Sequence, residues 1–342
     1  MEILEQEKIL VIQTAFLGDA VLTLPMIQKL KDKFPSSEIE VLCIPQTKEL
    51  FEHSNSVSAV ISYDKRGTQK SLFSFLKLIL LIRGKKYSQI YSPHRSFRSS
   101  LIVYLSGAKI TVGFDIASIN FVYLSCVKYK SEHHEVARNL DLIGFDTNND
   151  NWKILPKVDI DSSLERDTEK IIRNLTNKKI AAIAPGSVWN TKIYPRENYI
   201  EIIKYLIKKN YFVVLIGSKD DELLCGEIEN EFSESVKSFA GKFNIIESVS
   251  LLKICSVLIS NDSAPTHLGM IADIPTLTIY CSTVPAFGFT PYNEKSNYVS
   301  FDDLSCKPCG IHGYNQCPIQ TFDCGYKLLP QLVFSCLDKM NL

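Results

Sequence analysis

Apolar and polar positions follow two periods along the first half of the chain. Residues 8–14 (KILVIQT) form an apolar, β-branched run that suits a strand buried on both faces of a parallel sheet. Residues 20–34 instead place apolar side chains on one helical face, namely Val21, Leu24, Ile27 and Leu30. The same patterns predict strands at 38–44, 59–63, 89–91 and 109–114, and helices at 47–53, 71–83 and 96–105. This βαβα order predicts a parallel sheet covered by helices.

A polar segment interrupts this order, which then resumes. Residues 146–156 contain an Asn-Asn-Asp-Asn run and end in a proline, as a linker does, and a helix is predicted at 163–175. The pattern then predicts strands at 180–184, 212–216, 257–260 and 276–280, and helices at 197–208, 246–255 and 264–272. We therefore predict an α/β protein of two Rossmann-like lobes, residues 1–160 and 161–342, with a cleft between them. A final helix is predicted at about 326–342, and packing of this helix on the first lobe is one option for its position.

Composition and charge agree with a two-lobed globular protein. Of the 342 residues, 45% are hydrophobic and 22% charged, which is ordinary for a protein with a sizeable core. The formal net charge of +0 gives no global attraction to nucleic acid. The longest apolar run, 72–82, is too short to span a bilayer and contains Lys77, and residues 1–8 carry three glutamates and no apolar core. We therefore expect a cytoplasmic protein.

Ligands of open parallel sheets sit outside the carboxyl ends of the strands, so the residues that follow each strand are the candidates for chemistry. Neither lobe carries the G-x-G-x-x-G dinucleotide fingerprint or a P-loop, which argues against NAD-dependent dehydrogenases and ATPases. After the first strand, Gly18 permits a tight turn and Asp19 begins a helix. Asp19 is either the N-cap of that helix or a general base in the cleft, and the two roles are compatible.

Two segments of the second lobe suit phosphate binding. Ser187, in a Gly-Ser turn, offers backbone N–H groups and a hydroxyl, and Lys192 adds a point charge, although an ordinary loop with an exposed lysine has the same spacing. Residues 260–268 (SNDSAPTHL) follow a strand and open a helix, with Asp262 or Ser263 as the N-cap. The N–H groups of that first turn form an anion site, and His267 lies on the same turn, in either a binding or a structural role. Residues 282–283 follow the next predicted strand and add two hydroxyl groups at the same edge of the sheet.

With these segments in place, the chain resembles the ADP-heptose:lipopolysaccharide heptosyltransferases, which are inverting glycosyltransferases of the GT-B fold. The matching stretches run in the order of the family over nearly the whole chain: 9–25, 95–113, 134–140, 184–195, 260–274 and the C-terminal group that begins with Cys306 and Cys309. The family commonly has Gly where this chain has Ala264, and Gly-Ser-Thr-Asp-Pro where it has residues 281–285 (CSTVP). Both departures lie near the expected donor site and leave open a different sugar or nucleotide.

The resemblance implies a role for each matching residue. The catalytic residues would be Asp19, as the base that deprotonates the acceptor hydroxyl, and Lys192. The donor, ADP-heptose, would be held by Ser187, Asp262, Ser263, Ala264, His267 and Thr283. No cofactor is implied, and no metal is expected, because Lys192 and the helix terminus supply the charge that the leaving diphosphate needs.

The implied acceptor is lipid A with its inner-core lipopolysaccharide, which is anionic and would bring the enzyme into peripheral contact with the inner face of the inner membrane. Its expected partners, all of which could equally be solvated surface charges, are Lys65, Arg66, Arg95, Arg98 and Arg138. Two alternatives stay open: a GT-B transferase or epimerase that uses another nucleotide sugar, and a binding protein without catalysis. Cys306, Cys309, Cys317 and Cys324 are expected to be reduced and packed rather than to bind a structural metal, because the second pair is too widely spaced.

Overall fold

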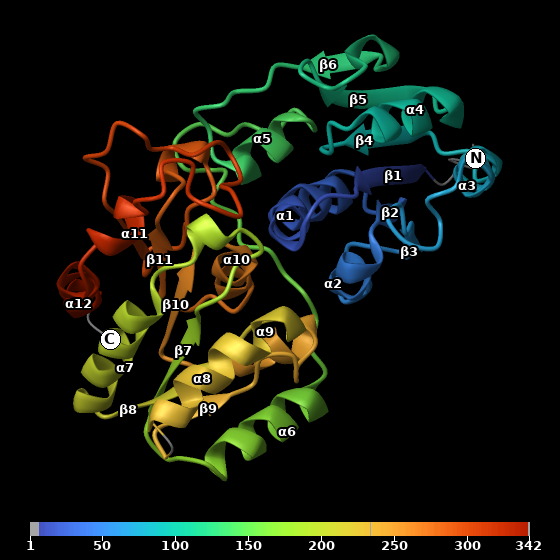
Figure 1. The fold of residues 1–342 in the computed structure, drawn as a ribbon. Helices are drawn as coiled ribbons and strands as arrows, with labels where there is room; N and C mark the ends of the chain where they lie inside the picture. The colour runs from blue at the N-terminus through green and yellow to red at the C-terminus, as the bar shows by residue number, and fades with distance from the viewer. Residues whose placement is uncertain (1–6, 233, 341–342) are drawn as a thin grey trace. The chain divides into compact units, whose positions relative to one another are not determined.

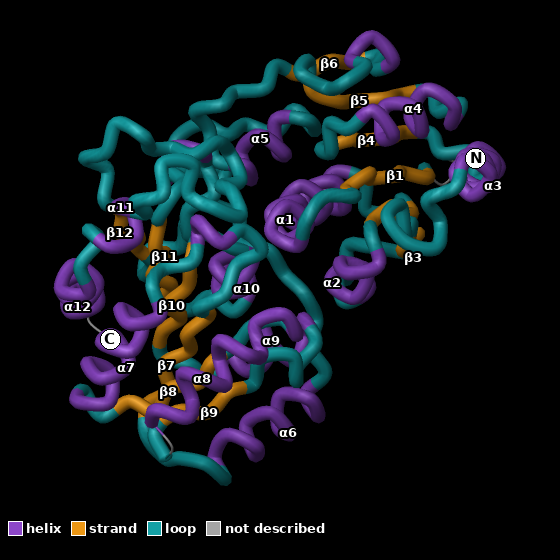
Figure 2. Tube along the Cα trace, in the orientation of Figure 1, coloured by secondary structure: helices purple, strands orange, loops and turns teal. Residues whose placement is uncertain are grey.

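A computed structural model of the chain describes residues 7–232 and 234–340. The chain divides into two compact units, Met1–Asp159 and Ile160–Leu342. Each unit contains one parallel six-stranded sheet, with helices packed against it (Figures 1 and 2). The prediction of an α/β protein with two parallel sheets is therefore confirmed.

The sheet of unit 1 has the strand order β3-β2-β1-β4-β5-β6. Its strands are β1 (Lys8–Gln13), β2 (Glu38–Cys43), β3 (Ala59–Ser62), β4 (Gln89–Ser92), β5 (Ile110–Phe114) and β6 (Ser125–Val127). Its helices are α1 (Leu17–Lys33), α2 (Lys48–Glu52), α3 (Leu72–Gly84), α4 (Phe97–Ser106) and α5 (Glu135–Asp141), with 3₁₀ turns η1 (Pro45–Thr47) and η2 (Asn120–Val122). Leu10 and Ile12 of β1 share one buried cluster with side chains of α3 and α4. Helices α1 and α5 pack against each other.

The sheet of unit 2 has the order β12-β11-β10-β7-β8-β9. Its strands are β7 (Lys179–Ala184), β8 (Tyr211–Leu215), β9 (Val236–Ser238), β10 (Val257–Asn261), β11 (Thr276–Tyr280) and β12 (Asn297–Ser300). Its helices are α6 (Ser162–Arg173), α7 (Arg196–Lys208), α8 (Glu222–Phe232), α9 (Ile245–Lys253), α10 (Ala264–Ile271), α11 (Asp323–Tyr326) and α12 (Pro330–Lys339), with 3₁₀ turns η3 (Asn190–Lys192), η4 (Lys219–Asp221) and η5 (Pro285–Phe287). Side chains of α7, α8 and α12 share a buried cluster with Ala181 and Ile183 of β7.

Several elements differ from the sequence prediction. Helix α1 begins at Leu17, three residues earlier than predicted, so Gly18 lies inside the helix instead of in a turn. The edge strands β6, β9 and β12 and helix α8 were not predicted; the strands are three or four residues long and lack an apolar run. The final helix packs against α7 and β12 of its own unit. No helix among the described residues has the length and apolar character that crossing a bilayer requires.

Candidate functional site

The strand order of each sheet reverses at one place, and the sequence-predicted residues follow the strands at these places. In unit 1 the reversal lies between β1 and β4, and in unit 2 between β7 and β10. Parallel strands on either side of such a reversal leave room for a ligand outside their carboxyl ends. Residues 14–19 and 93–98 lie at this position in unit 1, and residues 185–192 and 262–267 in unit 2.

In unit 2, the last residue of β10, Asn261, forms hydrogen bonds to the segment that follows β7. Asn261 is fully buried, and its Oδ1 accepts hydrogen bonds from the backbone N–H of Tyr194 (3.0 Å) and from the hydroxyl of Tyr199 (2.9 Å). Its Nδ2 donates to the carbonyl oxygens of Pro185 (2.7 Å) and Gly186 (3.2 Å). The loop after β7 is therefore fixed against the end of β10. Asn261 was not identified as a site residue from the sequence, although the segment 260–268, to which Asn261 belongs, was identified.

The next residue, Asp262, joins two other predicted site residues, Lys192 and Thr283, into one network. Its Oδ2 accepts from Nζ of Lys192 (2.7 Å) and from Oγ1 of Thr283 (2.7 Å). The side chains of Lys192 and Asp262 are only 13% and 10% exposed, so solvent screens this ion pair weakly. The loops after β7, β10 and β11 thus converge on one carboxylate; the sequence predicted these residues at one edge of the sheet, but not this contact.

Helix α10 begins directly beside this network. Ser263 is its N-cap in an extended conformation, but its side chain makes no capping hydrogen bond, and Pro265 occupies the first turn as predicted. Ala264 is the first helical residue. The amide groups of a helix's first turn have no intrahelical acceptor and carry the positive end of the helix dipole. This turn therefore favours an anion beside the Lys192 ammonium group.

His267 lies deeper than the sequence suggested. Its side chain is buried, and its Nδ1 has no hydrogen-bond partner within residues 7–232 and 234–340. Burial, and then the positive charge of Lys192, lower the pKa of His267 to about 3. The imidazole is therefore neutral at physiological pH and offers a hydrogen bond, not a positive charge.

The loop that carries Ser187 is shaped by close backbone approaches. A Cβ atom at Gly186 would lie 1.8 Å from Oδ1 of Asp221, which forms a capping box with Ser218 at η4, so only glycine fits. Ser187 is half-buried, and its hydroxyl accepts a long hydrogen bond from the N–H of Trp189 (3.4 Å). Further along the loop, the backbone N–H of Thr191 donates to the carbonyl oxygen of Tyr314, and the N–H of Tyr314 donates to the hydroxyl of Thr191. The C-terminal loop that carries Tyr314 therefore lies at this edge of the sheet.

In unit 1, Asp19 stands in the first turn of α1 rather than at its cap. The N-cap is Phe16, which makes no side-chain capping bond, and Asp19 is the third helical residue. Its backbone carbonyl accepts from the hydroxyl of Thr23 (2.8 Å). The electrostatic neighbour of Asp19 is Glu135 on α5, whose pKa is raised by burial and next by the negative charge of Asp19. Two carboxyl groups therefore approach each other at the carboxyl edge of the sheet.

Glu135 is a site residue that sequence reasoning missed, and Arg138 is its partner. Nη1 of Arg138 donates to Oε2 of Glu135 (2.7 Å), one helical turn away. Both side chains are buried, Arg138 at 2% exposure. Its guanidinium also donates to the hydroxyl of Tyr129 (2.8 Å) and to the carbonyl oxygens of Lys130 (3.0 Å) and Ser131 (2.7 Å). Arg138 thus holds the carboxylate of Glu135 in place and, in contrast to the expectation, does not present its charge at the surface. The Glu-x-x-Arg spacing of α5 was the available signal.

The other predicted cations gather around the segment between β1 and α1. Nζ of Lys65 donates to the carbonyl oxygen of Thr14 (2.6 Å), and Nη1 of Arg98 donates to the carbonyl oxygen of Lys65 (3.1 Å). The guanidinium of Arg66 lies 5.6 Å from the centre of the Phe16 ring. Burial lowers the pKa of Lys65, and the charges of Arg66 and Arg98 lower it further, as expected where like charges crowd.

Two groups tie these cations to the rest of the unit 1 site. His94, which follows β4, shares a 2.9 Å hydrogen bond with Thr14, and burial lowers its pKa to about 4, so it is neutral. The guanidinium of Arg95 lies 4.4 Å from the centre of the Tyr129 ring, the ring that Arg138 also contacts. The structure therefore brings Lys65, Arg66, Arg95 and Arg98 to the edge that holds Asp19. Neither His94 nor Tyr129 was predicted.

The C-terminal cysteines are free thiols. Burial raises the pKa of Cys309, and the neighbouring Cys306 and Cys317 raise it further, so these thiols lie near one another. Across the described part of the chain, no group of three or more His, Cys, Asp or Glu side chains is arranged to hold a metal ion.

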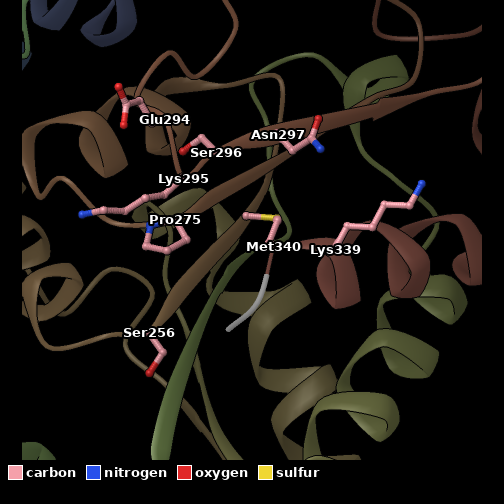
Figure 3. A pocket seen from close by; sticks show the side chains of 8 residues that line it. All are labelled: Ser256, Pro275, Glu294, Lys295, Ser296, Asn297, Lys339 and Met340. Carbon is pink, nitrogen blue, oxygen red and sulfur yellow. The ribbon is translucent and has the colours of Figure 1, made fainter.

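A pocket of about 560 Å³ lies elsewhere in unit 2, where residues at the amino ends of β10, β11 and β12 meet the end of α12 (Figure 3). It is lined by Ser256, Pro275, Glu294, Lys295, Ser296, Asn297, Lys339 and Met340. Because ligands of parallel sheets bind at the carboxyl ends of the strands, this pocket is not part of the candidate site.

Comparison with known proteins identifies the family. The profile of "Glycosyltransferase family 9 (heptosyltransferase)" matches residues 75–316, well over half of the chain. The chain belongs to this family. It is therefore a glycosyltransferase.

Individual heptosyltransferases resemble the chain over most of its length. Lipooligosaccharide heptosyltransferase 2 of Haemophilus influenzae is 23% identical, over 85% of this chain and 88% of that protein. The structure of E. coli ADP-heptose lipopolysaccharide heptosyltransferase II matches with a TM-score of 0.79 at 20% identity, over 97% of this chain and 98% of that one. E. coli heptosyltransferase WaaC with ADP-2-deoxy-2-fluoro heptose matches with a TM-score of 0.72 at 16% identity, over 97% and 99%. These structural matches confirm the predicted GT-B fold class.

Proposed function

We propose that this family 9 glycosyltransferase transfers a heptose from ADP-heptose to the inner core of lipopolysaccharide, with inversion at the anomeric carbon. The observation that carries the proposal is the network in which Lys192 and Thr283 meet Asp262 at the start of α10. An ammonium group beside a helix N-terminus suits the two phosphates of a nucleotide sugar. The similarity to WaaC, whose structure holds an ADP-heptose analogue, supports ADP-heptose as the donor.

The proposed reaction is a single displacement. An acceptor hydroxyl attacks the anomeric carbon of the heptose, the bond from that carbon to the diphosphate oxygen breaks, and the hydroxyl proton passes to the carboxylate of Asp19. Negative charge grows on the departing ADP, where Lys192 and the first-turn amides of α10 stabilise it more strongly than in the bound substrate. Ser187, Ser263, Ala264 and the neutral His267 complete the donor site.

Unit 1 supplies the base and the acceptor contacts in this proposal. Burial, and next the negative charge of Asp19, raise the pKa of Glu135, so Glu135 is the electrostatic neighbour of the proposed base. Lys65, Arg66, Arg95 and Arg98 attract the phosphates and carboxylates of the lipid A–inner-core acceptor, through which the enzyme contacts the membrane. Arg138 acts as a positioning residue for Glu135.

The test is turnover of ADP-heptose on a heptose-free core acceptor by the wild type and by Asp19→Asn. We expect the variant to lose about 10²–10⁴-fold in kcat. Asp32→Asn is the matched control, since Asp32 lies on the same helix with a side chain 66% exposed. NMR of the product should show the anomeric configuration opposite to that of the donor. Retention of full activity in Asp19→Asn would remove the base assignment.

Donor and acceptor arms of the same assay separate the alternatives. Ala264 and the CSTVP segment depart from the pattern that the resemblance implies near the donor, so UDP-sugars are tested beside ADP-heptose. Turnover of a UDP-sugar alone would replace the donor, and interconversion of the sugar without transfer would indicate an epimerase. An acceptor that already carries one heptose distinguishes the first transfer from the second.

A further inference from the structure

Helix α3 of unit 1 is apolar on both of its faces. Phe75, Leu78, Ile79 and Ile82 are buried in the core beneath it. A second set is exposed, here called the α3 stripe: Leu72 (74%), Phe73 (67%), Leu76 (47%), Leu80 (69%) and Leu81 (49%). A surface helix ordinarily turns charged or polar residues to water, so a stripe of five large apolar side chains marks a binding surface.

The exposed side of the helix also carries positive charge. With 3.6 residues per turn, Leu72, Leu76 and Leu80 project from one side, which borders the buried face of the helix. Lys77 and Arg83 are also exposed, and Nζ of Lys77 lies 4.6 Å from the centre of the Phe73 ring. The apolar surface and the cations are therefore interleaved rather than segregated.

The charge of this region is extreme for a chain of net charge +0. Residues 65–114 contain ten Lys and Arg and no Asp or Glu, so the rest of the chain holds 28 basic and 38 acidic residues. The basic residues are Lys65, Arg66, Lys70, Lys77, Arg83, Lys85, Lys86, Arg95, Arg98 and Lys109. Only part of this charge is neutralised locally, as where Lys85 pairs with Glu40. This excess of positive charge favours contact between the segment and an anionic partner.

Exposed apolar side chains continue beyond α3. Helix α4 packs beside α3, and Phe97 and Tyr104 of α4 are 59% and 65% exposed. The 3₁₀ turn η2 packs against α4 and carries Phe121, which is 84% exposed. Figure 1 shows α3 and α4 in unit 1.

We propose that the α3 stripe and its cations form a membrane-docking surface that inserts into the headgroup region of an anionic lipid bilayer. A helix of 13 residues is about 20 Å long, too short to span the roughly 30 Å hydrocarbon core, so it lies in the plane of the interface. The apolar side chains enter the acyl boundary while Lys77 and Arg83 contact lipid phosphates. This surface goes beyond the proposed function, because it requires neither donor nor acceptor.

A lipid surface fits these observations better than a second copy of the chain. A symmetric dimer through the α3 stripe would place the same residues of two copies against each other, and so cations against cations. An anionic bilayer instead supplies opposite charge and apolar contact together. Helix α4, which packs beside α3, carries Arg98 of the proposed acceptor residues on its first turn.

The test is cosedimentation of the full chain with vesicles that contain phosphatidylglycerol, compared with vesicles of phosphatidylcholine alone. We expect binding to the anionic vesicles that weakens as salt rises. Leu76→Gln with Leu80→Gln should weaken it at least tenfold, and Lys77→Glu about fivefold or more. Leu223→Gln is the matched control, because Leu223 is 76% exposed and lies on α8 of unit 2. This variant should bind the vesicles as the wild type does.

Three further measurements, of folding, of turnover and of oligomeric state, accompany the vesicle assay. The double variant should retain the wild-type circular dichroism spectrum and full turnover on a soluble core oligosaccharide, which separates membrane docking from folding and catalysis. Binding of the double variant equal to that of the wild type, or no binding of the wild type to anionic vesicles, would overturn the proposal. A change of oligomeric state by light scattering with vesicle binding intact would also overturn it and assign the stripe to a second copy. If the enzyme did not transfer heptose, the proposed function would fail, but vesicle binding would still support the membrane-docking surface.

Discussion

Arg138→Met removes the cation that holds the buried carboxylate of Glu135. Methionine keeps an unbranched apolar stem, but the guanidinium and its hydrogen bonds to Glu135, Tyr129, Lys130 and Ser131 are lost. Removal of one partner from a buried ion pair costs about 3–5 kcal/mol, because the remaining charge stays away from water. We therefore expect the free energy of unfolding to fall by about 3–5 kcal/mol at pH 8, which lowers Tm by roughly 6–20 °C for a unit of this size.

The penalty should depend on pH in a defined direction. Burial and the charge of Asp19 already raise the pKa of Glu135 above its ordinary value of 4.5. A raised carboxyl pKa contributes stability that is complete below pH 4.5 and is lost as the pH rises through the folded-state pKa. Loss of the Arg138 charge raises the pKa of Glu135 further. The destabilisation by Arg138→Met should therefore be largest at pH 8 and shrink as the pH falls toward 4.5.

The assay is urea unfolding at pH 8 and pH 5, followed by circular dichroism. A double-mutant cycle compares the wild type, Arg138→Met, Glu135→Gln and the double variant. Glu135→Gln in the Arg138→Met background should restore at least half of the lost stability, because it removes the unpaired charge. Arg138→Met with wild-type stability and a raised KM for the acceptor would refute the reasoning and return Arg138 to the acceptor surface.

Three further predictions concern unit 2. Lys192→Ala should lower kcat about 10²–10³-fold, because the leaving diphosphate loses its point charge, and activity within a few fold of wild type would exclude that role. The imidazole NMR signals of His267 should keep the positions of the neutral ring from pH 8 to pH 5, since its pKa is about 3. The histidine of the unfolded chain is protonated at a higher pH than the buried one, so the free energy of unfolding should fall as the pH drops below 6.5. A titration midpoint near pH 6.5 in the folded protein would contradict the burial argument. Gly186→Ala should cost about 1–3 kcal/mol in chemical denaturation, because its Cβ would meet Asp221, whereas Gly226→Ala in α8, with open space around its Cβ, should not destabilise.

The local pattern of the sequence was enough for most of the framework. Apolar runs such as residues 8–14 specify strands because they can be buried on both faces, and helical spacing specifies the intervening helices. The short edge strands were not predicted, since three residues such as those of β9 carry too little periodicity to indicate a strand. Strand β9 forms because β8 offers it an edge with which to pair. The start of α1 also escaped, because the extended conformation of Phe16, and not a capping side chain, sets it.

At the site, the sequence determined which residues follow the strands, and the tertiary structure decided what each of them touches. Rules for parallel sheets were sufficient to predict that Lys192, Asp262 and Thr283 share one edge. The burial of Arg138 was not predictable in this way, because an arginine on a short helix has the same sequence pattern whether its charge meets water or a carboxylate. That outcome depends on how α5 packs against α1, which brings Glu135 beside Asp19. Ionisation and burial are properties of that packing, and no local pattern records them.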